Sequence, residues 1–215
     1  MSDFSLIRHE LNKLTHLPPW GRKQADGWDQ LSNFVYRIHT LAGVQRQAQA
    51  VARAKNLEIE LFSNYALRRW YNHHTHDQIL QIFCAHPDVR VEANRKHSTI
   101  DFYLRDLPFD LKVSRFPRAY PATIESARQN PHQLALWQYE NQSQQGRYHT
   151  GNRLFIVLHD QTQPAQTWQL RRDFETLQTL IEDFLLAPTL LGLTVKHQHS
   201  GEIFQPWSGV IFYTR

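Results

Sequence analysis

Two acidic residues and one lysine lie close together near the middle of the chain. Asp110 and Lys112 are one residue apart in residues 108–114 (PFDLKVS), and Asp101 precedes them in residues 99–104 (TIDFYL). Two neighbouring carboxylates repel one another unless a cation lies between them, and Mg²⁺ prefers oxygen ligands. A lysine beside such an ion could stabilise the negative charge that develops in phosphodiester hydrolysis, or help to position the attacking water. These three residues are therefore the candidate catalytic group, and the two acids are the candidate metal ligands.

The sequence around these residues predicts a β-hairpin. Residues 99–104 and 109–114 are rich in β-forming side chains, and residues 105–108 (RDLP) are typical of a turn. Side chains alternate between the two faces of a strand, so Asp110 and Lys112 share one face while the apolar residues between and around them share the other.

The position of the turn decides where Asp101 falls. With the turn centred between Asp106 and Leu107, Asp101 lies opposite Lys112, and paired residues point to the same face of a sheet. Two carboxylates and one ammonium group would then converge on one side of an apolar hairpin. The alternative without a function is a solvated hairpin at the edge of the sheet that carries an Asp–Lys surface pair, which is a common arrangement.

The rest of the chain reads as helices first and then as alternating strands and helices. We expect an α/β fold in which a central mixed β-sheet is flanked by helices, with a helical N-terminal extension in residues 1–56 and the α/β core in residues 57–215. The hydrophobic spacing predicts helices at residues 4–17, 24–56, 57–71, 76–84, 123–142 and 170–186, and strands at residues 89–92, 154–158 and 210–213 in addition to the hairpin.

Asp101 together with Asp110-Leu111-Lys112 resembles the signature of the PD-(D/E)xK nuclease superfamily, which includes restriction and repair enzymes. The resemblance covers residues 57–160, and Asp101 follows Ile100 where many members have proline. It implies a restriction endonuclease-like core, with the first acid and the acid-x-Lys group on adjacent strands of a central mixed sheet after a helix. It also implies an Mg²⁺- or Mn²⁺-dependent endonuclease that hydrolyses DNA, for which restriction and phage defence are candidate roles.

Many members of that superfamily add an acidic residue from the helix before the hairpin. Glu60 and Glu58, in residues 57–62 (LEIELF), are the candidates here, and Glu60 is taken as a further catalytic and metal-binding residue. The alternative is that both glutamates are solvated and interact favourably with the N-terminal end of the helix dipole.

Basic residues near the hairpin and on the preceding helix are candidate nucleic-acid contacts. The chain has 18 Arg against 6 Lys, and the planar guanidinium group matches phosphate geometry. The candidates for contacts to phosphate groups are Lys96, Arg115, Arg118, Arg68 and Arg69. The alternative for each of them is an ordinary solvated side chain.

Composition fits a folded protein whose partner is DNA. The chain has 24 basic and 20 acidic residues, an excess that permits a polyanionic partner without requiring one. A single cysteine, Cys84, rules out an intramolecular disulfide and a cysteine-based zinc cage. No signal peptide or membrane-spanning run is recognised, which favours a cytoplasmic protein with no membrane partner. The helical N-terminal region is a candidate recognition element or homodimer interface.

Two other functions compete with the nuclease. Residues 73–77 (HHTHD) and the pair His159-Asp160 could indicate a His-Asp phosphohydrolase, but the spacing of a helical zinc motif is missing and residues 73–77 are expected to form a solvent-exposed helix junction. The second alternative is a non-catalytic nucleic-acid-binding or assembly protein with a nuclease-like fold. The presence of both acids and the lysine argues against this second alternative, because a site without catalytic activity would retain two carboxylates that repel one another.

Overall fold

The computed structural model describes residues 3–22, 27–94, 97, 99–141, 150–196 and 201–215. The chain divides into two compact units, Met1–Gln78 and Ile79–Arg215. The boundary falls inside one long helix, so the unit limits differ from the division at residue 56 that the sequence suggested. Each unit is described below by itself.

The first unit is entirely helical in its described part. A long helix was expected at residues 24–56, and two shorter ones at residues 57–71 and 76–84. The structure instead breaks the former at a 3₁₀ turn and fuses the latter two into one helix of 26 residues. Its elements are α1 (Asp3–Asn12), α2 (Gly27–Leu31), η1 (Asn33–Tyr36), α3 (Leu41–Ala54) and the first part of α4 (Ile59–Cys84).

Side chains of α4 hold the segment around η1. His74 is buried, and its Nε2 lies 3.0 Å from the carbonyl oxygen of Val35 and 3.2 Å from that of Ile38. The indole Nε1 of Trp70 donates to the same Ile38 carbonyl at 2.6 Å. Thr75 is fully buried and bonds back to the Tyr71 carbonyl, as helical threonines often do. Residues 73–77 are therefore part of a continuous, partly buried helix, and the expected solvent-exposed junction was wrong.

The second unit contains the sheet. Its helices are the end of α4, then α5 (Ile124–Gln129) and α6 (Pro131–Glu140), which asparagine and proline separate at residues 130–131, then the 3₁₀ segment η2 (Pro164–Arg172) and α7 (Phe174–Leu186). The strands are β1 (Val89–Val91), β2 (Phe102–Leu104), β3 (Leu107–Arg115), β4 (Arg153–His159), β5 (Leu191–Gly192), β6 (Val195–Lys196), β7 (Ile203–Phe204) and β8 (Trp207–Thr214).

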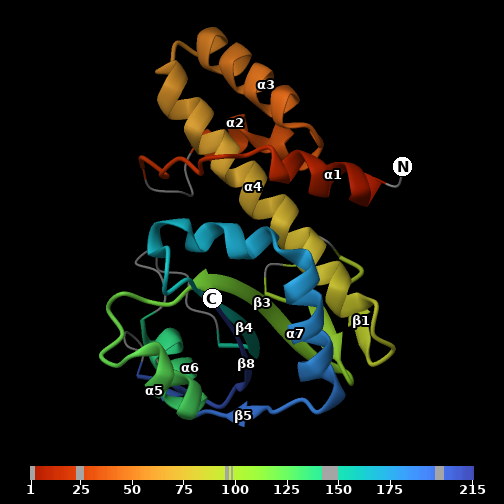
Figure 1. Cartoon of the computed structure of the whole chain (residues 1–215), viewed down its shortest axis with the longest axis vertical. Helices are drawn as coiled ribbons and strands as arrows, with labels where there is room; N and C mark the ends of the chain where they lie inside the picture. Colours follow the sequence, from red (N-terminus) through yellow and green to blue (C-terminus); the bar gives the residue numbers. More distant parts are fainter. Residues whose placement is uncertain (1–2, 23–26, 95–96, 98, 142–149, 197–200) are drawn as a thin grey trace. The chain divides into compact units, whose positions relative to one another are not determined.

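Six of these strands form one mixed sheet in the order β1-β2-β3-β4-β8-β5 (Figure 1). The strands β1, β2 and β3 pair antiparallel, whereas β3, β4 and β8 run parallel to one another. Parallel neighbours need a crossover connection, which α5 and α6 supply between β3 and β4, and η2 with α7 between β4 and β8. The sheet thus changes from antiparallel to parallel pairing at β3.

The two faces of the sheet are covered by different helices. On one face Phe83 of α4 stacks on Phe102 and Phe102 on Phe109, with ring centroids 5.1 and 5.8 Å apart. The same face has Gly209 in β8, where an added Cβ would lie 2.8 Å from the Phe184 ring of α7, so the absence of a side chain lets that helix approach closely.

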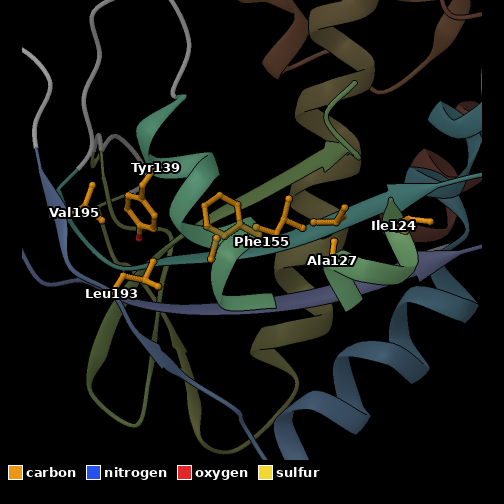
Figure 2. Close-up of a cluster of buried hydrophobic side chains, with 9 residues drawn as sticks. Ile124, Ala127, Tyr139, Phe155, Leu193 and Val195 are labelled. Carbon is orange, nitrogen blue, oxygen red and sulfur yellow. The ribbon is translucent and has the colours of Figure 1, made fainter. Parts of the chain in front are cut away.

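The opposite face is covered over β4 by α5 and α6. Figure 2 shows the buried cluster there, in which Tyr139 of α6 lies against Phe155 of β4 with ring centroids 5.7 Å apart. The buried members are Ile124, Ala127, Leu134, Ala135, Tyr139, Phe155, Val157, Leu193 and Val195.

The expected fold class is confirmed: the protein is α/β, with a mixed sheet flanked by helices and a helical N-terminal region. None of the described helices combines the length and the apolar character that crossing a membrane would require.

Candidate functional site

The hairpin of β2 and β3 turns earlier than the sequence suggested. Arg105 and Asp106 both have positive φ, at 47° and 68°, as the two central residues of a type I′ hairpin turn do. Leu104 consequently pairs with Leu107, and Phe102 with Phe109. The expected pairing of Asp101 with Lys112 was therefore wrong.

The regular pairing of β2 with β3 ends at Phe102 and Phe109. One residue earlier, the N–H of Asp101 donates to the Phe109 carbonyl at 2.8 Å, which is outside that register, so strand alternation does not fix the face of Asp101. Asp110 and Lys112 share one face of β3, as predicted.

The carboxylate of Asp101 is fixed against the backbone of β3. Its Oδ2 accepts a hydrogen bond from the N–H of Leu111 at 2.7 Å, and Leu111 lies between the other two candidate residues. In a regular ladder with the observed register, that N–H would donate to the carbonyl of Ile100. The side chain of Asp101 occupies that N–H where β2 ends, so its carboxylate lies at the backbone of β3, at the residue between Asp110 and Lys112.

Asp110 is paired with an arginine that the sequence analysis did not single out. Arg153, the first residue of β4, is its direct neighbour in the parallel β3–β4 pair. The Nε of Arg153 donates to Asp110 Oδ2 at 2.8 Å, and the arginine side chain is 5% exposed against 19% for the aspartate. A buried cation without a partner is costly, so this pair stabilises the fold only while both members are present.

Lys112 extends from the same face and remains exposed. Within the described part of the chain it forms no hydrogen bond or salt bridge. Protein atoms that displace water from its ammonium group lower the pKa of Lys112 below its usual value, and the charge of Arg153 adds to this effect. Attraction by Asp110 and by Asp101 acts in the opposite direction and raises the pKa.

A third acid, Glu92, was also missed. Continuing the β1–β2 register by one residue places it beside Asp101, and its N–H donates to the Asp101 carbonyl at 3.0 Å. Its carboxylate accepts from the hydroxyl of Tyr103 at 2.7 Å and from the N–H of Asn94 at 2.8 Å. Glu92 is thus the neighbour of Asp101 on one side of the hairpin, and Arg153 is the neighbour of Asp110 on the other.

The sequence contains one indication for each of the two residues that were missed, Arg153 and Glu92. Arg153 directly precedes the apolar run of β4, where a charge next to a buried strand needs a partner. Glu92 ends the short segment before the hairpin, and antiparallel pairing would bring it to the first acid.

The acidic residue expected from the helix before the hairpin belongs to the first unit. Glu60 is exposed in the first turn of α4 and belongs to the first unit, so it is not among the residues that the second unit brings together. The carboxylate of Glu58 accepts from the N–H groups of Glu60, at 2.9 Å, and of Leu61. Glu58 therefore caps the N-terminus of α4, as the alternative interpretation expected.

Two of the expected nucleic-acid contacts are used inside the first unit. Arg69 donates to the Asp29 carbonyl and the Ser32 hydroxyl, both at 2.5 Å, and to the Tyr36 hydroxyl at 2.6 Å. Arg68 donates to the Pro18 carbonyl at 2.7 Å. These bonds connect α4 to the preceding segments, and neither arginine is retained as a phosphate ligand.

The remaining expected contacts lie around the hairpin. Arg115, at the end of β3, and Arg118, in the loop that follows, are both exposed and stay candidates for phosphate contacts. Lys96 lies outside the described residues.

The pair His159-Asp160 has a structural role. Asp160 is buried, its Oδ2 pairs with the guanidinium of Arg215 at 2.7 Å, and its Oδ1 accepts from the N–H groups of Thr162 and Gln163 at 3.1 and 2.8 Å. The Gln163 bond and the Arg215 bond lower the pKa of Asp160 to about 2. This carboxylate holds the turn after β4 to the C-terminal end of the chain.

The acids on the sheet face suit a hard divalent cation that has few protein ligands. Mg²⁺ is usually held by one or two carboxylates, with water and substrate phosphates completing its coordination. Asp101 and Asp110 meet that requirement. In the described ranges no group of three or more His, Cys, Asp or Glu side chains could hold a metal, so an all-protein cage of the kind that Ca²⁺ or structural Zn²⁺ prefers is not present there.

Comparisons of the chain with family models, curated proteins and solved structures find no match.

Proposed function

We propose that the second unit is a metal-dependent endonuclease that hydrolyses DNA phosphodiester bonds, with Mg²⁺ or Mn²⁺ as the cofactor. The observation that carries this proposal is the bond of the Asp101 carboxylate to the Leu111 N–H, which brings this acid to β3 at the residue between Asp110 and Lys112. The order of elements adds support, because a helix, an antiparallel pair with these acids and a parallel third strand is the arrangement that the PD-(D/E)xK resemblance implies.

Each side chain has a definite part in such a reaction. Asp101 and Asp110 would hold the cation, which supplies Lewis-acid polarisation of the phosphoryl oxygen and a more acidic water. Lys112 has the freedom of an exposed side chain and can reach a phosphate oxygen or the attacking water. Its ammonium group would stabilise the charge that develops on the phosphate. Arg115 and Arg118 are the candidate contacts to the phosphate backbone.

One observation favours a second candidate function, a non-catalytic nucleic-acid-binding or assembly protein. The charge of Asp110 is already compensated by Arg153, so the two acids need no metal to offset their repulsion. The presence of both acids is therefore weaker evidence for catalysis than the sequence alone suggested. Lys112 distinguishes the two functions by experiment, since hydrolysis depends on its ammonium group whereas binding through the exposed arginines does not.

A plasmid-nicking assay tests the proposed function. The protein with Mg²⁺ or Mn²⁺ should nick or degrade supercoiled DNA, and EDTA should stop the reaction. Asp101→Asn should lose activity on the order of 10²–10³-fold, the usual effect of removing one electrostatic group from a reaction centre. The amide oxygen of asparagine can still accept from Leu111, so the fold is retained.

Asp106→Asn is the matched control, because it removes the same charge from the same hairpin, in an exposed turn where asparagine tolerates positive φ. It should cleave like the unmodified protein. Retention of DNA without cleavage in either metal would instead support the binding protein. Discrete fragments would identify a sequence-specific enzyme.

A further inference from the structure

Positive side chains accompany the acids of the candidate site. Arg153 is paired with Asp110, and the charges of Lys112 and Arg171 lie close by, beside the carboxylates of Asp101, Asp110 and Glu92. A divalent cation that binds at Asp110 therefore meets a carboxylate whose charge is already compensated. This differs from an uncompensated carboxylate pair, which attracts such an ion strongly.

Arg153 is the positive side chain that the fold holds in place. Its side chain is 5% exposed, and the Cζ atom lies 5.7 Å from the centroid of the Tyr139 ring. Tyr139 is itself held by the bond from its hydroxyl to the Gly151 carbonyl at 2.9 Å. The arginine backbone is anchored on its other side, because the buried hydroxyl of Ser208 donates to the Arg153 carbonyl at 3.1 Å.

The pairing occupies only part of Asp110. Nε of Arg153 meets Oδ2 at 2.8 Å, and this carboxylate is the more exposed partner of the pair. A metal could therefore share Asp110 with the arginine through the second oxygen, but it would do so next to a resident positive charge.

We propose that Arg153 is a positioning residue that keeps the metal affinity of the site low until a nucleic acid is bound. It holds Asp110 in place as a built-in counter-ion, and the phosphates of a bound strand supply the negative charge that the site lacks. This inference rests on the proposed function, and it adds that metal and nucleic acid bind cooperatively.

Mn²⁺ binding in the absence of nucleic acid tests this directly, by electron paramagnetic resonance or calorimetry. Arg153→Gln keeps a donor that can reach Asp110 and removes the positive charge. It should bind Mn²⁺ more tightly than the unmodified protein, by roughly 10- to 100-fold, the range in which groups next to metal ligands change affinity. The gain should disappear in Arg153→Gln/Asp110→Asn, which shows that it acts through Asp110.

Arg115→Gln is the matched control for charge. It removes the same charge from an exposed position on the same strand and should leave Mn²⁺ affinity within about twofold of the unmodified protein, because exposed charges are screened by salt. An Arg153→Gln variant that binds Mn²⁺ no more tightly than Arg115→Gln would overturn the inference.

A second measurement covers the case in which Arg153→Gln does not fold. The unmodified protein keeps both acids, Lys112 and Arg153, and its Mn²⁺ affinity should rise at least about fivefold when a short, cleavage-resistant phosphorothioate duplex is added, the lower end of the usual coupling between two sites. Equal affinity with and without the duplex would contradict the inference.

The two proposals fail in different ways. If the unmodified protein cleaves DNA but neither measurement shows the expected change, the role of Arg153 is wrong and the nuclease stands. If neither the unmodified protein nor Arg153→Gln binds Mn²⁺ or cleaves DNA, both proposals are wrong.

Discussion

At the scale of residues, Asp110 has two roles that must be separated before any variant is interpreted. As a candidate metal ligand it should matter for catalysis, and as the partner of the buried Arg153 it matters for folding. Loss of activity in Asp110→Ala would therefore not identify a catalytic acid. Asp101→Asn keeps the acceptor for the Leu111 N–H, and Lys112 forms no hydrogen bond or salt bridge with the described residues, so these two are the more informative positions.

Asp110→Ala should lower the free energy of unfolding by about 3 kcal/mol, because it leaves the Arg153 guanidinium buried without a counter-ion. Asp110→Asn should cost less, since its amide oxygen can still accept from Nε. Urea unfolding measures both. The exposed acid Asp183 of α7 is the control, and Asp183→Ala should change stability by less than about 0.5 kcal/mol. A neutral effect of Asp110→Ala would show that the ion pair contributes no stability.

The common face of Asp110 and Lys112 could be predicted from the sequence, whereas the position of Asp101 and the counter-ion of Asp110 could not. Strand alternation fixes the face of Asp110 and Lys112 regardless of the partner strand, but the N–H of Asp101 bonds to the Phe109 carbonyl, outside the regular register. Arg153 is 43 residues away from Asp110, and their contact depends on which strand follows β3 in the sheet. No local pattern specifies that pairing.

At the scale of elements, the hairpin turn is strained by its own residues. Type I′ turns favour Asn-Gly or Asp-Gly, and Arg105-Asp106 has neither glycine nor asparagine. A two-residue turn was therefore not predicted from these residues. Pro108 instead favoured a turn over residues 105–108. The side chain of Arg105 offers a reason for its presence, because its Nε pairs with Asp88 Oδ2 at 2.9 Å.

Asp106→Gly should stabilise the protein by about 0.5–1 kcal/mol, because glycine adopts a φ of 68° without steric cost. Asp106→Val should destabilise it, since a β-branched residue at positive φ is a steric outlier. Thermal unfolding of the two variants beside the unmodified protein measures both effects. Equal midpoints for the glycine and valine variants would mean that the turn does not hold this conformation.

The contact between α4 and η1 should make stability depend on pH. Burial, with repulsion from His73, lowers the pKa of His74 from 6.5 to about 4. The unfolded chain therefore takes up a proton as the pH falls below about 6.5, and the folded chain does so only near 4. Stability from this group is complete above pH 6.5 and is lost as the pH falls towards 4, by about 3 kcal/mol in total.

Chemical unfolding of the full chain at pH 7 and pH 4.5 measures this loss. His74→Gln, which cannot titrate but can still donate to the Val35 and Ile38 carbonyls, should show a smaller pH dependence. The remaining dependence should come in part from His73, whose pKa burial also lowers. An unchanged pH dependence in His74→Gln would exclude the buried imidazole as its cause.

At the scale of the whole molecule, the chain combines a helical unit with an α/β unit, and α4 belongs to both. The sequence predicted β1 to β4, α7 and β8 of the second unit because each has a clear period and clear boundaries, such as the apolar run that became β4. It missed the two-residue strands β5, β6 and β7, which are too short to show a period. It predicted the first unit less well. The break at η1 and the continuity of α4 through residues 73–77 are decided by tertiary contacts of His74, Trp70 and Arg69, which no local pattern reveals.

The nuclease proposal is tested most directly by one lysine in the second unit. Lys112 is exposed and forms no bond with the described residues, so Lys112→Met should leave the unfolding midpoint unchanged, to within about 0.5 kcal/mol of stability. Lys196→Met removes an equally exposed lysine from β6 of the same unit and serves as the control.

The measurement is the initial rate of Mg²⁺-dependent plasmid nicking by the two variants and the unmodified protein. We expect Lys196→Met to cleave at the unmodified rate and Lys112→Met to be slower on the order of 10²–10³-fold, with both equally stable. Undiminished nicking by Lys112→Met, or an unmodified protein that does not cut DNA in Mg²⁺ or Mn²⁺, would contradict the assignment.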